Sequence, residues 1–268
     1  MERAGKLLVI NMKKISVVLA TFNEAKNIGM CLNSVRDWAD EIVVVDGSST
    51  DATREIAQKE YRAKVIKTTN KANFHINKQL AMDEAKGDLV LQLDADEVVE
   101  PALKKFILKI AKQDKTEEAA WWVPRKNLFL GKWLTKGGQY PDAVIRLYLV
   151  GKAKLPQKDV HEQMVVAGKI GWAEGHLLHY SNPSFADYMR KFNTYTSFKA
   201  QQWFEQGKRV NFLGSLYYMG WLPLWIFAKL YFRHRGYVDG YPGFIFALMS
   251  GLHFSIAYLK LWELQQQS

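Results

Sequence analysis

The chain has 268 residues, of which 48% are hydrophobic and 24% are charged, and its formal net charge is +10. This length suits one large α/β domain or one domain with an appendage, and the composition excludes a disordered chain. The positive charge indicates a partner that carries negative charge, such as an anionic membrane surface or a phosphorylated substrate. The single cysteine, Cys31, excludes an internal disulfide.

The first half of the chain predicts strands that alternate with helices. Short β-branched and apolar runs are bounded by polar, glycine-containing segments, and each is followed by a helical pattern. Such alternation implies right-handed βαβ units and a mostly parallel sheet. The strands are expected at residues 15–20, 41–46, 63–67 and 89–93, and the helices at 27–35, 74–85 and 102–112.

The stretch LVLQLDADEVVE at 89–100 joins an apolar strand to a cluster of acids. Asp94 and Asp96 are two residues apart, so on an extended backbone both side chains point to the same side and can hold one hard divalent cation. An acid-x-acid pattern in an exposed turn is more often a solvated loop. Here the acids follow a buried strand, where unpaired charge is costly and where open α/β sheets bind ligands. A metal site is therefore predicted.

After residue 112 the pattern changes to short strands and turns, at 121–125, 131–142 and 144–151. Loops rich in Gly, Tyr and Pro beside a sheet edge are suited to form an acceptor pocket. No segment of the sequence is convincing as a linker to a second independent domain.

The C-terminal part is apolar. Segments 212–232 and 242–262 are almost uncharged, and each approaches the length of about 20 residues that crosses a bilayer. Basic and aromatic residues flank them, as at a membrane interface. The alternative is a pair of helices that covers the sheet, but such helices usually show a polar face and these show almost none. We expect a C-terminal pair of apolar membrane-associating helices that lie in or dip into the interface.

Seven motifs follow one another in an order and spacing that resemble a known family. They are VVLATFNEAKNI (17–28), VVVDGSSTDAT (43–53), LDADE (93–97), YPDAVIRLY (140–148), VHE (160–162), HYS (179–181) and RGYVDGYPGFIFAL (235–248). They resemble the inverting family-2 glycosyltransferases with the GT-A fold, and among these the bacterial lipopolysaccharide-core β-1,4-glucosyltransferase type. The resemblance covers nearly the whole chain.

This resemblance implies an α/β GT-A fold with a Rossmann-like, mostly parallel sheet flanked by helices. It implies a catalytic domain at 1–207, with a nucleotide-sugar half at 13–112 and an acceptor half at 113–207. The C-terminal region at 208–268, called the tail below, is then the membrane-associating part.

The resemblance also implies site residues. For the UDP-sugar donor they are Thr21, Asn23, Glu24, Asp46, Lys78, Asp94 and Arg146, and for a Mg²⁺ or Mn²⁺ ion they are Asp94, Asp96 and His179. Three of these have ordinary structural alternatives. Asp46 could instead be a turn or helix-cap acid, Arg146 could be an exposed strand residue paired with an acid, and His179 could be structural. Lys78 is followed by Gln79, where the family usually has Asn.

An inverting transfer needs a base that takes the proton of the acceptor hydroxyl. Glu162 in VHE is the first candidate and Asp142 in YPD is the second, with Glu97 as a more remote choice. The metal would stabilise the leaving diphosphate electrostatically.

The expected activity is transfer of a hexose, glucose first, from a UDP-sugar to a lipid-linked saccharide of the lipopolysaccharide inner core, at the cytoplasmic face of the inner membrane. One alternative is transfer to polyprenyl phosphate, as in dolichyl-phosphate-mannose synthase-like proteins, with Arg125 and Arg146 as candidate phosphate ligands. Another is a basic surface-binding module. The first half lacks the aromatic and basic stripe of nucleic-acid binders, so nucleic acid is not expected as a partner.

Overall fold

The structure is a computed structural model that describes residues 12–71, 73–156 and 163–267. The described residues group into two compact units. One unit takes the described residues within Met1–Arg125 and Ala143–His179, and the other takes those within Lys126–Asp142 and Tyr180–Ser268. The functional division of the chain at residue 207 stays a prediction.

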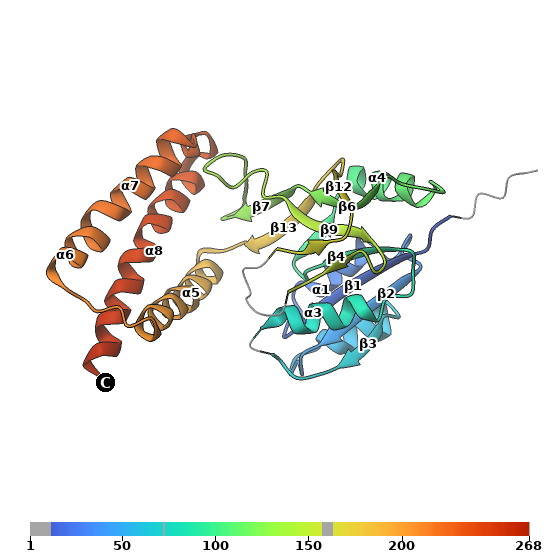
Figure 1. The fold of residues 1–268 in the computed structure, drawn as a ribbon, viewed down its shortest axis with the longest axis horizontal. Helices are drawn as coiled ribbons and strands as arrows, with labels where there is room; N and C mark the ends of the chain where they lie inside the picture. Colours follow the sequence, from blue (N-terminus) through green and yellow to red (C-terminus); the bar gives the residue numbers. More distant parts are fainter. Residues whose placement is uncertain (1–11, 72, 157–162, 268) are drawn as a thin grey trace, which may run out of the picture. The chain divides into compact units, whose positions relative to one another are not determined.

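The first unit is built on a seven-stranded sheet with the order β12-β6-β9-β4-β1-β2-β3 (Figure 1). Strands β1, β2, β3 and β4 run parallel to their neighbours among themselves, as do β6 and β12, whereas β9 runs antiparallel to both β4 and β6. The predicted mostly parallel α/β sheet is confirmed. The strands are β1 (Ile15–Thr21), β2 (Glu41–Asp46), β3 (Lys64–Lys67), β4 (Leu89–Leu93), β6 (Glu118–Val123), β9 (Val144–Leu149) and β12 (Lys169–Trp172).

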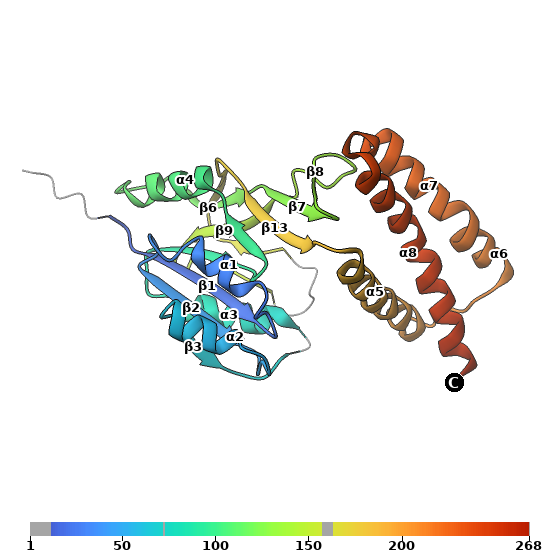
Figure 2. The same cartoon turned by 180° about the vertical axis from the view of Figure 1, so that it is seen from behind.

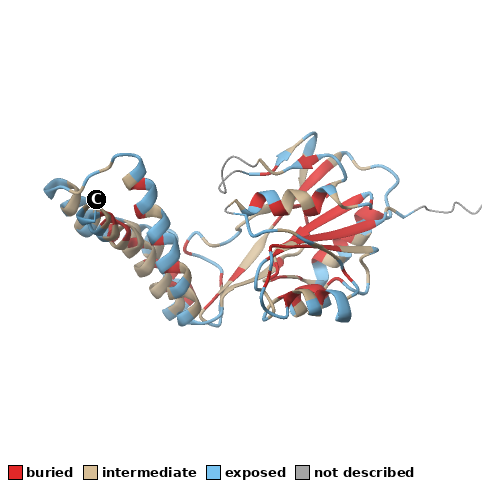
Figure 3. Ribbon diagram, turned by 90° about the horizontal axis from the view of Figure 1, so that it is seen from below, coloured by how far each residue is buried: buried red, intermediate tan, exposed pale blue. Residues whose placement is uncertain are grey.

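Helices cover both faces of this sheet because its central strands alternate their apolar side chains between the two sides. Val17 and Leu19 of β1 pack in one core cluster with residues of α1 (Ile28–Asn33) and α4 (Pro101–Ala111). Val18 packs in a second cluster with residues of α3 (Phe74–Asp83). Figure 3 shows that the buried residues of this unit concentrate in the strands of the sheet.

Smaller elements complete the first unit. Helix α2 (Thr53–Glu55) continues into the π-helical turn η1 (Ile56–Glu60), and β10 (Ala153–Lys154) pairs with β11 (Val165–Val166). The acidic turn, residues 94–97, leads into strand β5 (Glu97–Val99), which begins at the last residue of the turn. Strand β5 pairs antiparallel with the start of β13 (Leu177–Asn182).

The second unit contains the antiparallel pair β7 (Arg125–Phe129) and β8 (Lys132–Leu134), and the long helices α5 (Phe185–Glu205) and α8 (Gly240–Gln266). A small core joins these two helices through Ala200 and Trp203 of α5 and Tyr258 of α8. Figure 2 shows α7 running beside α8.

The predicted pair of C-terminal helices is present only in part. Helix α8 is long and continuous, but the run before it is divided into α6 (Phe212–Ser215), η2 (Leu216–Trp221), α7 (Leu222–Ala228), η3 (Lys229–Arg233) and η4 (Gly236–Asp239). Two of these segments, η2 and η3, are π-helical. Pro223 stands at the first turn of α7, where its missing N–H interrupts the regular ladder that an uninterrupted helix would need.

By length and composition, one helical stretch among the described residues, Gly236–Gln266, could cross a membrane. A third of its most apolar window, 33%, is buried within the structure. Core helices of soluble proteins can pass the same test, so this property alone does not assign a membrane role to the tail.

Candidate active site

The carboxyl ends of the central strands bring the predicted donor residues to one edge of the sheet. Thr21 ends β1 and is the direct register partner of Asp46, which ends β2. On the other side of β1, Leu19 is the partner of Leu93, the residue before Asp94. The parallel arrangement of these strands therefore places Thr21, Asp46 and the acidic turn on the same edge, as the sequence predicted.

Asp46 is fully buried and accepts several hydrogen bonds within its own turn. Its carboxylate accepts from the Ser49 amide at 3.0 Å, from the Ser49 hydroxyl and from Thr21 Oγ1 at 3.4 Å. The Arg54 Nε atom lies 3.7 Å away. These contacts are those of a turn-forming acid, and the contact of Asp46 with uridine stays a prediction.

The loop after β1 is fixed to the loop after β2 by side-chain hydrogen bonds. Asn23 has a left-handed backbone with φ +55°, a conformation that Asn adopts more readily than most residues. Its side-chain oxygen accepts from the backbone N–H of Thr50 at 2.8 Å. Its backbone N–H donates to Ser49 Oγ, also at 2.8 Å. Glu24 accepts from Asn27 Nδ2 at 2.7 Å. The two loops thus form one connected edge.

Both oxygens of Asp94 contact cationic side chains. Lys78 Nζ lies 2.5 Å from one oxygen, and a guanidinium nitrogen of Arg146 bonds the other. Burial would raise the pKa of Asp94, but Arg146 and Lys78 outweigh burial and hold that pKa well below its ordinary value. Burial lowers the pKa of Lys78 even though Asp94 opposes the shift.

Arg146 is buried and lies among carboxylates. Besides Asp94, its guanidinium donates to Glu97 Oε1 at 3.0 Å and to the side-chain oxygen of Gln92. Burial opposes its charge, but Asp94 and Glu97 outweigh burial and raise the pKa of Arg146 above its ordinary range. The alternative of an acid-paired strand arginine was correct in its pairing and wrong in its exposure. A direct role toward donor or acceptor stays a prediction.

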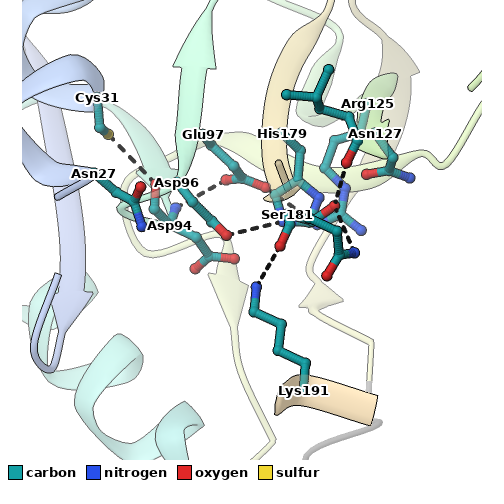
Figure 4. Close-up of polar contacts among 12 residues, drawn as sticks. Asn27, Cys31, Asp94, Asp96, Glu97, Arg125, Asn127, His179, Ser181 and Lys191 are labelled. Carbon is teal, nitrogen blue, oxygen red and sulfur yellow. Dashed lines mark hydrogen bonds and ion pairs between the residues drawn. The ribbon is translucent and has the colours of Figure 1, made fainter. Parts of the chain in front are cut away.

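Glu97 is the centre of the acidic turn (Figure 4). Its side chain is completely buried, and one oxygen accepts from the Asp94 amide at 2.9 Å. The other oxygen accepts from Arg125 at 3.2 Å and from Arg146. A carboxylate held by two arginines and a backbone amide fixes the geometry of the turn.

Asp96 and His179 meet at the open side of this turn. Asp96 Oδ2 lies 3.5 Å from His179 Nε2, because β13 pairs His179 with Glu97. Figure 4 shows both side chains beside that of Asp94. Among the residues that the structure describes, no three His, Cys, Asp or Glu side chains are grouped closely enough to hold a metal ion.

The donor atoms at the turn nonetheless fit a divalent cation that takes its other ligands from phosphates and water. Mg²⁺ is commonly held by one or two carboxylates with substrate phosphates, and Mn²⁺ also accepts carboxylate ligands. Asp96 offers such an oxygen, and His179 offers a nitrogen when its ring is neutral. Asp94 offers two further oxygens, each of which also contacts a cationic side chain, Lys78 or Arg146.

One residue of this network, Gln92, is absent from the predicted site, although its position in β4 carries a signal. Gln92 is the only polar residue of β4, is 1% exposed, and contacts both Arg146 and Asp94. A buried amide needs hydrogen-bond partners, so a glutamine inside an apolar strand pointed to a buried polar neighbour.

Cys31 also lies at the turn, where its thiol donates to the Asp94 carbonyl at 3.5 Å. Burial raises the pKa of this thiol well above its ordinary value, and the charge of Glu97 adds to the effect.

Of the two leading candidates for the catalytic base, the structure describes only Asp142. Glu162 lies outside the described residues. Asp142 belongs to the second unit, where it accepts from Asn127 Nδ2 at 3.0 Å. The assignment of the base between them stays a prediction.

This chain is similar in sequence to known proteins. The model of the family described as "Glycosyl transferase family 2" matches residues 16–158, which include the edge from Thr21 to the acidic turn. An uncharacterized glycosyltransferase of Rickettsia typhi is 30% identical over 96% of this chain and 89% of its own length. The lipopolysaccharide core biosynthesis glycosyltransferase LpsC of Rhizobium meliloti is 30% identical over 93% of this chain and 92% of its own length. The crystal structure of residues 1–349 of S. aureus TarS, 16% identical, covers 95% of this chain and 92% of that chain with a TM-score of 0.45.

Proposed function

Because this chain belongs to glycosyltransferase family 2, we propose that it is a metal-dependent inverting enzyme that transfers a hexose, glucose, from a UDP-sugar to a lipid-linked saccharide. The proposed acceptor is the inner core of lipopolysaccharide, the class of glycan in the name of the Rhizobium relative. The observation that carries the proposal is the polar edge where β1, β2 and β4 end side by side.

On the donor side, we assign uridine to the edge formed by the connected loops after β1 and β2, with Thr21, Asn23, Glu24 and Asp46 as its contacts. A site for an uncharged base needs fixed hydrogen-bonding groups rather than mobile ones. The bonds that join Asn23 to Thr50 and Asp46 to Ser49 supply that rigidity.

The diphosphate is assigned to the acidic turn, where Asp96 and His179, with Asp94, would hold Mg²⁺ or Mn²⁺. The metal would stabilise the negative charge that the UDP leaving group gains as the glycosidic bond breaks. Lys78 would then turn from Asp94 to a phosphate oxygen. Its amine is 2.5 Å from Asp94, so a small side-chain movement would both release the carboxylate from this contact and place a cation on the diphosphate.

Arg146 and Arg125 are proposed to hold the acidic turn in place through Glu97. Both arginines donate to Glu97. Asp94 is in turn held at two points, because its backbone amide donates to Glu97 and its carboxylate contacts Arg146. The polyprenyl-phosphate alternative needs these two arginines as acceptor ligands. Their engagement with a completely buried carboxylate leaves the saccharide acceptor as the better supported choice.

The tail is proposed to attach the enzyme to the cytoplasmic face of the inner membrane, as a peripheral or monotopic protein. Its helical run exposes large apolar side chains: Phe212 and Leu213 are each 76% exposed and Leu224 is 69% exposed. Several large exposed apolar side chains in one short segment of a soluble monomer indicate a contact with lipid or protein. Nearby Arg209 and Arg233 are exposed and would attract anionic lipid.

A panel of nucleotide sugars tests the core of this proposal. Calorimetry of the full chain with UDP-glucose, UDP-galactose and GDP-mannose should show binding of a UDP-sugar that requires Mg²⁺ or Mn²⁺ and is lost in excess chelator. Equal binding of all three donors without metal, or binding of none, would contradict the proposal.

A further inference from the structure

The C-terminal signature RGYVDGYPGFIFAL contains a buried acid that the functions above leave unused. Asp239 is 1% exposed and stands at the N-cap position of α8, where an aspartate ordinarily accepts a hydrogen bond from its own helix. Here the carboxylate makes no such cap bond. It is directed instead to a segment of the chain more than 100 residues earlier.

This partner is the loop that follows β8. One oxygen of Asp239 accepts from Thr135 Oγ1 at 2.7 Å, and the other accepts from the amides of Thr135 at 2.9 Å and Lys136 at 2.8 Å. Hydrogen bonds from neutral donors to a buried carboxylate are among the stronger ones in proteins. We call these hydrogen bonds of Asp239 to Thr135 and Lys136 the clamp. Both elements that they join belong to the second unit, so the clamp is internal to that unit.

The surrounding turn is built tightly enough to hold the aspartate in place. A Cβ atom added at Gly236 would lie 2.8 Å from the Leu230 carbonyl oxygen, and one added at Gly243 would lie 2.1 Å from the Gly236 oxygen. The Gly137 amide donates to the His234 carbonyl at 2.9 Å, which gives the loop a second attachment to the tail.

The clamped loop leads to Asp142. We call residues 135–142 the acceptor loop, because the proposed function places a candidate base at its end. Its far end is also fixed: Asn127 Nδ2 donates to the Gln139 carbonyl at 3.4 Å and to Asp142 Oδ2 at 3.0 Å. The loop is thus held by the tail at its start and by β7 at its end.

We propose that Asp239 is a positioning residue that couples the tail to the acceptor loop, so that the tail helps to form the acceptor site as well as to attach the enzyme to lipid. This inference rests on the proposed function, since the loop matters to catalysis only if the acceptor binds there. The donor residues Thr21, Asp46 and Asp94 belong to the first unit, so the clamp should affect the acceptor and leave donor binding unchanged.

The test compares three variants of the full chain with UDP-glucose as donor and inner-core lipopolysaccharide in detergent as acceptor. Asp239→Asn keeps the shape of the side chain, but it removes the negative charge and leaves one acceptor oxygen where the wild type has two. Thr135→Val removes only the hydroxyl bond. Ser255→Ala is the matched control, because Ser255 is a buried α8 residue whose hydroxyl donates to the Tyr218 carbonyl at 2.8 Å, within the tail.

In Asp239→Asn we expect kcat/KM for the acceptor to fall about 10- to 100-fold, since a displacement of roughly 1 Å at a reacting group can cost about 100-fold. The donor KM should stay unchanged. Thr135→Val should show a smaller loss, and the two losses should not add in the double variant because they share one contact. Hydrogen exchange of the 135 and 136 amides should accelerate in Asp239→Asn and stay at the wild-type rate in Ser255→Ala.

Each other outcome decides against a defined part of the argument. Wild-type acceptor kinetics in Asp239→Asn, or an equal loss in Ser255→Ala, would overturn the positioning role alone. If Asp239→Asn does not fold, as judged by circular dichroism, Thr135→Val decides by the same criteria. A wild-type chain that transfers no sugar to this acceptor would contradict the proposed function, and the role of Asp239 with it.

Discussion

Among single residues, Asp96 has the strongest expected effect on catalysis. Its carboxylate lies beside His179 Nε2, the other proposed metal ligand, whereas the carboxylate of Asp94 contacts Lys78 and Arg146. We expect Asp96→Ala to abolish transfer while leaving the unfolding temperature near that of the wild type. Transfer assays with Mg²⁺, with Mn²⁺ and with excess chelator provide the measurement, and full turnover in chelator would contradict metal dependence.

The choice of base is a second question at the scale of the residue. A general base contributes typically 10²–10⁴-fold to the rate and little to donor affinity. We therefore expect Glu162→Gln to lose transfer by about this factor and to bind UDP-sugar as the wild type does. Normal transfer by Glu162→Gln together with loss in Asp142→Asn would assign the role to Asp142.

The depressed pKa of Asp94 gives a pH dependence with a definite sign. Because its folded-state pKa lies below the ordinary value of 3.8, the Asp94 carboxylate contributes stability above that value, and this contribution is lost as the pH falls through the folded pKa. Removing one partner of a buried ion pair costs about 3–5 kcal/mol, and we expect a smaller cost at Asp94 because its side chain is 25% exposed. Urea unfolding should thus separate Asp94→Asn from the wild type most clearly at pH 7, and the difference should shrink at acid pH. A difference that grows on acidification would refute the assignment.

At the scale of the element, the packing of α7 against α8 depends on a glycine. A Cβ atom added at Gly251 would lie 2.5 Å from the Pro223 carbonyl oxygen. Gly251→Ala should therefore lower the free energy of unfolding by about 1–3 kcal/mol, the usual cost of overpacking. Gly220 is the matched control, since nothing lies within 4 Å of a Cβ added there. If Gly220→Ala is equally destabilising in thermal melts, close helix contact is not the cause.

The elements also show what sequence patterns can and cannot predict. Strands β1, β2 and β4 were predictable because each is a local apolar run that ends in a polar turn. The insertion of β9 between β4 and β6 was not, because pairing Leu91 with Leu147 is a long-range choice of register that leaves no local pattern. That insertion is also what buries Arg146 beside Asp94, so the ion-pair network was hidden for the same reason.

At the scale of the whole molecule, the tail should determine where the enzyme resides. We expect the full chain to sediment with anionic liposomes and a chain that ends at Gly207 to remain in solution, because the exposed Phe212, Leu213 and Leu224 are then absent. Raising the salt concentration should weaken the association only in part, since apolar contact persists when charge is screened. Equal solubility of both chains without detergent, with no sedimentation of either, would contradict the membrane assignment.

The position of Cys31 gives the protein a natural reporter of its own motion. The sequence contains one cysteine, and its thiol lies fully buried against the carbonyl of Asp94. A thiol reagent can reach it only when the core around α1 and the acidic turn opens, so the labelling rate measures such openings without any engineered probe. Slower labelling in the presence of UDP-sugar and metal would show how much the ligands reduce the frequency of these openings.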